Sequence, residues 1–179
     1  MGKIHVLSSE VSNKIAAGEV VERPSSVIKE LVENSIDAGA TLISVEIKKG
    51  GSIYMRVSDN GSGMSEEDAK ICFLRHATSK VQTSSDLDAI YTLGFRGEAL
   101  SSIAAVAQVE LITKTYEELT GTRYVIEGSK EVENEEIGAP EGTTFIVRNL
   151  FYNVPARRKF LKTAQTEAGY ISDLMERMA

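Results

Sequence analysis

Cysteine is nearly absent from this 179-residue sequence, in which Cys72 stands alone. A single cysteine excludes an internal disulfide framework and any CxxC metal or redox motif, and it is compatible with a reducing compartment. Long apolar runs are missing as well, because the longest, IAAVA at 103–107, is far too short to cross a bilayer. The N-terminus, MGKIHVLSSE, has no apolar signal region. We therefore expect no secretion and no membrane contact, with a cytoplasmic location in a bacterium or a nuclear one in a eukaryote.

Two common nucleotide-binding patterns are also missing. The sequence contains no GxxxxGK[ST] P-loop, and the GxG at 61–63 lacks the third glycine and the strand–helix–strand context of a dinucleotide fold. A net charge of -6 argues against a surface built as a whole for nucleic acid. Any contact with a polyanion must therefore be local, and any nucleotide must be bound by another route.

The hydrophobic pattern predicts a mixture of helices and strands. A helix over 24–39 is indicated by Pro24 in the first turn, an apolar face and Gly39 as the stop. Strands at 42–50 and 52–59 are predicted to form a hairpin. Further strands are expected at 108–114, 122–127, 130–137 and 143–148, and further helices at 65–74, 97–106, 154–162 and 166–178. This order predicts an α+β fold with helices on one face of a largely antiparallel sheet.

Three polar residues form a stripe on the helix predicted over 24–39. Glu30, Asn34 and Asp37 lie at i, i+4 and i+7. A carboxylate there could orient and deprotonate a water, and an amide oxygen one turn away could bind a hard cation such as Mg²⁺. Spacing alone does not distinguish this site from a solvated helix face.

The stretch SDNGSGM, residues 58–64, follows a predicted strand and ends at Met64. It is compatible with a simple turn. It is equally compatible with a base-binding site, in which the carboxylate of Asp59 accepts from an exocyclic amine and Gly61 and Gly63 let the backbone approach a flat ring. Adenine offers an amino donor where guanine offers an acceptor, so Asp59 would select adenine.

GFRGEAL at 94–100 places two glycines and an arginine before a predicted helix. Free N–H groups at a helix start attract anions, so this segment is either a phosphate-binding site or a structural turn. The polar loop before it, with Thr78, Ser79 and Lys80, is predicted to close over a ligand. GTTFIV at 142–147 is a glycine turn entering a strand, where Thr143 could contact a base edge or merely begin the strand.

In order, ELVENSIDAGAT, SDNGSGM, RHATSK, GFRGEAL, GTTF and FYNVPARRKF resemble the N-terminal ATPase region of the MutL family of DNA mismatch repair proteins. That family belongs to the GHKL group, with gyrase-B-type topoisomerases, heat-shock chaperones and histidine kinases. The resemblance covers essentially the whole chain. GFRGEAL disfavours a topoisomerase subunit, and neither histidine lies in a recognisable phosphoacceptor helix.

The resemblance implies a Bergerat-type (GHKL) two-layer sandwich, with a mixed, mostly antiparallel sheet and with ATP and Mg²⁺ between sheet and helices. It implies that Glu30 is the general base, that Asn34 ligates Mg²⁺, and that Asp59, assisted by Thr143, recognises adenine. Further contacts to the nucleotide are implied for Asp37, Gly61, Gly63, Met64, Thr78, Ser79, Lys80, Gly94, Phe95, Arg96, Gly97, Glu98, Ala99 and Leu100.

The resemblance also implies what lies outside these residues. Residues 1–179 would form one GHKL ATP-binding domain, cut before a second domain that supplies a lysine to the γ-phosphate and much of a DNA groove, so hydrolysis by this chain would be weak. Expected partners are a second N-terminal domain, of like or unlike subunit, and a MutS-like mismatch-recognition protein. The basic run at 156–159 is compatible with a solvated face, a contact to the second domain or a DNA phosphate contact.

Two functions fit these expectations. One is an ATP-hydrolysing switch in which nucleotide orders the lid, pairs the N-terminal domains and changes the repair partners. The other is a nucleotide-gated binding module without hydrolysis. Glu30 favours the enzyme, because a pure binder needs no base at that position.

Overall fold

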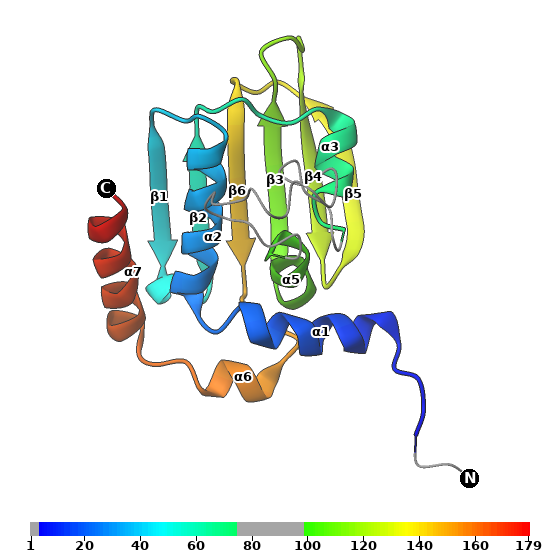
Figure 1. Cartoon of the computed structure of the whole chain (residues 1–179), viewed down its shortest axis with the longest axis vertical. Helices are drawn as coiled ribbons and strands as arrows, with labels where there is room; N and C mark the ends of the chain where they lie inside the picture. The colour runs from blue at the N-terminus through cyan, green and yellow to red at the C-terminus, as the bar shows by residue number, and fades with distance from the viewer. Residues whose placement is uncertain (1–3, 75–98) are drawn as a thin grey trace, which may run out of the picture.

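A computed structural model describes residues 4–74 and 99–179 of the chain. A six-stranded sheet in the order β1-β2-β6-β3-β4-β5 forms its centre, and every strand pair in these residues is antiparallel. Figure 1 shows α2, α3 and α5 on one face of this sheet, α7 beside β1, and α1 and α6 along one end. The expected α+β sandwich, with helices on one face of the sheet, is confirmed.

The strands are β1 (Ile43–Lys48), β2 (Tyr54–Asp59), β3 (Gln108–Lys114), β4 (Gly121–Glu127), β5 (Lys130–Ile137) and β6 (Gly142–Arg148). The short turn η1 (Lys49–Gly51) joins β1 and β2 in the predicted hairpin. All the strands predicted from 42 to 148 are present, with ends that differ by a few residues.

The helices are α1 (Ser9–Val20), α2 (Pro24–Asp37), α3 (Glu66–Ile71), α5 (Ala99–Val106), α6 (Pro155–Lys159) and α7 (Ala164–Met178). α2 begins at Pro24 as predicted, and it buries Val27, Ile28 and Leu31 in the core beneath it. Since these residues share one face of the helix, their burial fixes α2 on the sheet. Within the residues that the structure describes, no helix is both long and apolar enough to span a membrane.

The helix α1 was not predicted from the sequence. Ser8 caps it by accepting from Val11 N, and the helix packs against α5. Ala17 is fully buried, whereas Val11 and Ile15 remain exposed, so the apolar residues of α1 do not form one buried stripe. Without that stripe the sequence gives no helical period to detect.

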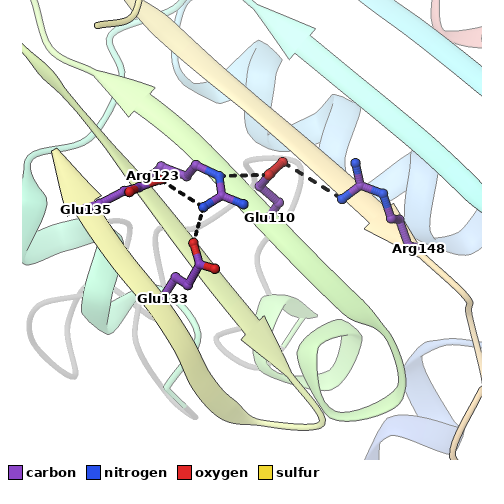
Figure 2. A network of polar contacts seen from close by, with 5 residues as sticks. All are labelled: Glu110, Arg123, Glu133, Glu135 and Arg148. Atoms are coloured by element: carbon purple, nitrogen blue, oxygen red, sulfur yellow. Dashed lines mark hydrogen bonds and ion pairs between the residues drawn. The ribbon is translucent and has the colours of Figure 1, made fainter. Parts of the chain in front are cut away.

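The face of the sheet opposite the helices bears charged side chains that pair across strands (Figure 2). Arg123 on β4 contacts Glu110 on β3 at 2.9 Å, Glu135 on β5 at 2.9 Å, and Glu133 on β5. Arg148 on β6 lies 3.9 Å from the other carboxylate oxygen of Glu110. One guanidinium therefore holds three carboxylates from two neighbouring strands, and these hydrogen bonds, first of all the one to Glu133, raise the pKa of Arg123.

We predict that Arg123→Met lowers the free energy of unfolding by about 1 to 2 kcal/mol, because three carboxylates lose their common cation. The control is Arg56→Met, since Arg56 lies 3.9 Å from the half-exposed Glu46. That variant is expected to lose at most about 0.5 kcal/mol. Urea unfolding measures both, and equal losses would contradict a network role for Arg123.

Candidate functional site

The strand register divides the helix-covered face of the sheet into apolar rows and one polar row. Val57, Phe145 and Leu111 are neighbours across β2, β6 and β3. One step further along the same strands, the neighbours are Asp59, Thr143 and Thr113, and Thr122 on β4 continues the row. We call Asp59, Thr143, Thr113 and Thr122 the polar row. Its three threonines are buried, with between 1% and 7% of their surface exposed.

Asp59 is held by hydrogen bonds from three parts of the chain. Its Oδ2 accepts from Ser35 Oγ on α2 at 2.6 Å. Its Oδ1 accepts from Gly61 N at 2.8 Å and from Thr143 N at 3.3 Å. Hydrogen bonds to a charged acceptor are worth about 1.5 to 3 kcal/mol each, so the carboxylate is fixed in place before any ligand arrives.

Thr113 forms hydrogen bonds with two backbone segments that lie around Asp59. Its Oγ1 accepts from Met64 N at 2.9 Å, donates to Gly142 O at 3.1 Å and lies 2.9 Å from Thr143 Oγ1. One hydroxyl thus joins the end of the loop after β2 to the start of β6.

Loop 60–64 lies against the end of α2. Ser62 N donates to Ala38 O at 3.0 Å, and Asn60 Oδ1 accepts from Thr41 N at 2.8 Å and Leu42 N at 3.0 Å. Gly63 has φ +70°, and a Cβ there would lie 2.0 Å from Lys114 O. Close packing of the protein backbone is therefore enough to require glycine at position 63, without reference to a ligand.

The predicted stripe on α2 is present, since one continuous helix contains Glu30, Asn34 and Asp37. Glu30 is buried with 7% of its surface exposed, Asn34 is half-buried, and Asp37 is exposed. Glu30 is therefore not part of a solvated helix face. Burying a carboxylate raises the free energy of the folded state unless other groups compensate its charge.

The donor set for a metal is sparse in the part of the chain that the structure describes. No group of three or more His, Cys, Asp or Glu residues there could hold an ion. Mg²⁺ often takes one or two protein oxygens and completes its shell with phosphate oxygens and water. The half-buried amide of Asn34 fits that mode of binding, in which the nucleotide brings most of the ligands.

Several predicted site residues lie outside the described ranges, so their placement is untested: Thr78, Ser79, Lys80, Gly94, Phe95, Arg96, Gly97 and Glu98. The next two, Ala99 and Leu100, form the first turn of α5, where Ala99 is buried and Leu100 packs against the core. The side chain of Met64 also packs against the core.

Sequence reasoning missed two residues, Ser35 and Thr113. Ser35 follows Asn34 in a helix, and nothing in its spacing shows that its hydroxyl reaches Asp59. Thr113 did leave a signal, because in QVELITK at 108–114 it shares the face of Val109 and Leu111 and is the polar residue on that face. A polar residue on a buried face needs a hydrogen-bond partner.

A cavity of about 350 Å³ lies away from the polar row, between α2 and α7. Arg23, Lys29 and Arg177 line it together with Asp173. Arg23 lies 4.0 Å from buried Glu167, and Lys29 lies 3.5 Å from Glu33. Three carboxylates therefore accompany the three cations, so the cavity is a poor anion site.

Cys72 is not a candidate nucleophile. Its Sγ donates to Ala69 O at 3.3 Å, and burial is the main factor that raises the pKa of the thiol to about 12. The thiol is therefore protonated at neutral pH, and only the thiolate is reactive.

Comparisons with known proteins agree with the fold described above. A family model described as histidine kinase-, DNA gyrase B-, and HSP90-like ATPase matches residues 22–147. The structure of the Aquifex aeolicus MutL ATPase domain complexed with ADP superimposes with a TM-score of 0.71 and 35% identity, covering 89% of this chain and 56% of that one. An N-terminal domain of a DNA repair protein gives a TM-score of 0.75 and 32% identity, over 91% of this chain and 46% of that one.

The chain thus has the fold of a GHKL-type ATPase domain. The DNA mismatch repair protein MutL of Agathobacter rectalis is 68% identical over 179 residues, and that of Acidobacterium capsulatum is 56% identical over the same length. The chain belongs to the MutL family within the GHKL group. It spans 28% and 27% of the length of these two relatives.

We predict that Gly142→Ala destabilises the fold by about 3 kcal/mol or more. Gly142 has φ +122°, and an added Cβ would lie 2.1 Å from Asp59 O. Gly138→Ala is the control, because nothing lies within 4 Å of a Cβ there, and it is expected to change stability by no more than about 0.5 kcal/mol. Thermal unfolding compares the two, and a Gly142→Ala protein as stable as the parent would show that the approach of β6 to Asp59 is not tight.

Proposed function

We propose that this chain is the ATP-binding and ATP-hydrolysing domain of a mismatch-repair switch. The observation that supports it most is the fixed carboxylate of Asp59 at the end of the sheet. A carboxylate offers about four lone-pair positions. Gly61 N and Thr143 N occupy those on Oδ1, and Ser35 occupies one on Oδ2. Counting the contacts made by residues 4–74 and 99–179, one acceptor position is therefore left, on Oδ2.

An exocyclic amino group matches that remaining position. Adenine carries its amino group at the ring position where guanine carries a carbonyl oxygen. A carbonyl oxygen facing Oδ2 would place two acceptors together and leave both without a proton, which is costly away from water. Selection of adenine over guanine therefore follows from the chemistry of Asp59.

We predict that a non-hydrolysable ATP analogue with Mg²⁺ raises the melting temperature by about 5 to 10 °C at a hundred times its Kd. The corresponding GTP analogue is expected to give a much smaller rise. Asp59→Asn is expected to weaken ATP binding by about tenfold or more, because it removes a charge-assisted acceptor.

Asp173→Asn, on the exposed face of α7, is the matched control and is expected to bind ATP like the parent. Calorimetry with each nucleotide measures these affinities. Equal shifts with ATP and GTP would contradict the role of Asp59, and no shift at millimolar ATP analogue would contradict the nucleotide site as a whole.

Two residues of α2 divide the catalytic work in this proposal. Glu30 orients the attacking water and removes its proton, and its burial favours that role because desolvation strengthens a carboxylate as a base. Asn34, one turn later, presents its amide oxygen to Mg²⁺. When bound, the ion neutralises charge on the phosphate oxygens.

We predict that Glu30→Gln leaves nucleotide binding nearly intact and lowers turnover by about 10² to 10⁴, the usual contribution of a general base. Asn34→Ala is expected to weaken binding itself, because the ion and the triphosphate lose a positioning oxygen. Hydrolysis is measured in a longer fragment that includes the chain after residue 179, and binding is measured by calorimetry in both fragments.

Glu33→Gln is the matched control, since Glu33 is also a buried glutamate of α2 but pairs with Lys29 at 3.5 Å. It is expected to change stability without changing turnover per folded molecule. If Glu30→Gln hydrolyses ATP at the parent rate, Glu30 is not the base, and a nucleotide-gated binding module becomes the better interpretation.

The wider cycle is part of the same proposal. ATP would be coupled to the choice of repair partners, among them a MutS-like protein and DNA. The coupling would use nucleotide contacts from residues 78–80 and 94–100, ordering of the segment that contains these residues as a lid, and pairing of two N-terminal domains. The likeness to MutL proteins supports these steps. Residues 1–179 act here as one nucleotide-binding domain whose turnover is weak without the cations that a following domain would add.

A further inference from the structure

The three contacts of the Thr113 hydroxyl limit where its proton can lie. Met64 N can only donate, so Thr113 Oγ1 accepts from it at 2.9 Å. Gly142 O can only accept, so its contact at 3.1 Å is a hydrogen bond when the single proton of Thr113 points to it. The third contact, to Thr143 Oγ1 at 2.9 Å, is then a hydrogen bond only if Thr143 donates.

We propose that Thr113 is a positioning residue that sets the hydrogen-bonding polarity of the base site by consuming the hydroxyl proton of Thr143. Thr143 then has only lone pairs to offer a ligand or a bridging water. This inference rests on the proposed function, because it concerns the adenine contacts of Asp59 and Thr143.

The consequence is a recognition edge made of acceptors alone. Asp59 contributes the remaining position on Oδ2, and Thr143 contributes the lone pairs of Oγ1. An amino group, with two N–H donors, matches such an edge, and a carbonyl oxygen at the same ring position does not. A threonine with a free proton could rotate it toward that carbonyl and so tolerate the wrong base. Thr113 would thus contribute to selectivity without touching the nucleotide.

The burial of Thr113 makes this polarity persistent. Only 1% of its surface is exposed, so water cannot compete for its hydroxyl. Its partners Met64 N and Gly142 O lie in two different segments, each packed closely on its neighbour. Rotation of the hydroxyl proton toward Thr143 would break the hydrogen bond to Gly142 O, which is unfavourable.

The test compares ATP with inosine triphosphate, whose base has a carbonyl oxygen in place of the amino group and a hydrogen on the neighbouring ring nitrogen. The triphosphate of unsubstituted purine, which lacks the amino group and keeps that nitrogen unprotonated, separates the two changes. In Thr113→Val the hydroxyl is lost and the Thr143 proton is released. We expect ATP to bind about tenfold more weakly while inosine triphosphate binds as before or more tightly, so that the ratio of the two Kd values falls by about tenfold or more. Thr113→Ser keeps the hydroxyl and is expected to keep the ratio within about twofold.

Thr122→Val is the matched control, because Thr122 lies opposite Thr113 on β4 and is also buried, with 6% of its surface exposed. It is expected to keep the ratio. If Thr113→Val weakens both nucleotides equally, Thr113 is merely structural and the inference is wrong. If Thr113→Val does not fold, Thr143→Val provides the test: loss of an acceptor weakens ATP alone, whereas equal weakening of both nucleotides overturns the inference.

The parent protein separates this inference from the function on which it rests. A parent that binds neither nucleotide contradicts the proposed function. A parent that selects ATP, together with a Thr113→Val protein that selects it equally well, contradicts only the role of Thr113.

Discussion

The structure around the candidate site depends on one constraint, the need to hold a carboxylate at the end of a buried strand. Asp59 meets it with donors from α2, from loop 60–64 and from β6. Each donor requires its element to be close. α2 must lie over β2 for Ser35 to reach Oδ2, and β6 must pair in the observed register for Thr143 N to reach Oδ1. The close backbone packing at Gly63 and Gly142 follows from the same requirement.

The same register lets stability and binding occupy one sheet face without conflict. Apolar neighbours such as Val57, Phe145 and Leu111 form the core beneath α2, and the polar row begins one step further along the strands. A register slip of one residue would bring charged outer residues such as Arg56 into the core, so burial of the apolar rows enforces the position of Asp59. On the opposite face, Arg148 and Glu110 add a contact between β6 and β3, and Arg123 adds contacts from β4 to β3 and β5.

Local signals in the sequence were sufficient for the hairpin, for α2 and for Asp59 as the candidate base contact. Pro24, Gly39 and the alternation along each strand are properties of neighbouring residues, so they can be read without the fold. Ser35 and α1 could not be found in this way. The bond from Ser35 to Asp59 joins residues 24 positions apart, and α1 owes its position to packing against α5. The roles of Glu30 and Asn34 rest on resemblance, strengthened for Glu30 by its burial.

Selectivity between adenine and guanine in such a site depends on which hydrogen-bonding groups carry protons more than on the shape of the site. A carboxylate that already accepts three hydrogen bonds has its orientation fixed, and a threonine whose proton is used elsewhere has its polarity fixed. Neither property is visible from the residue that meets the ligand, because Thr143 alone can donate or accept. We propose that Thr113 makes this choice through one buried hydroxyl. We therefore expect a hydroxyl at that position to be required for base selectivity, whereas the hydroxyl of the neighbouring buried Thr122 is expected to be dispensable for it.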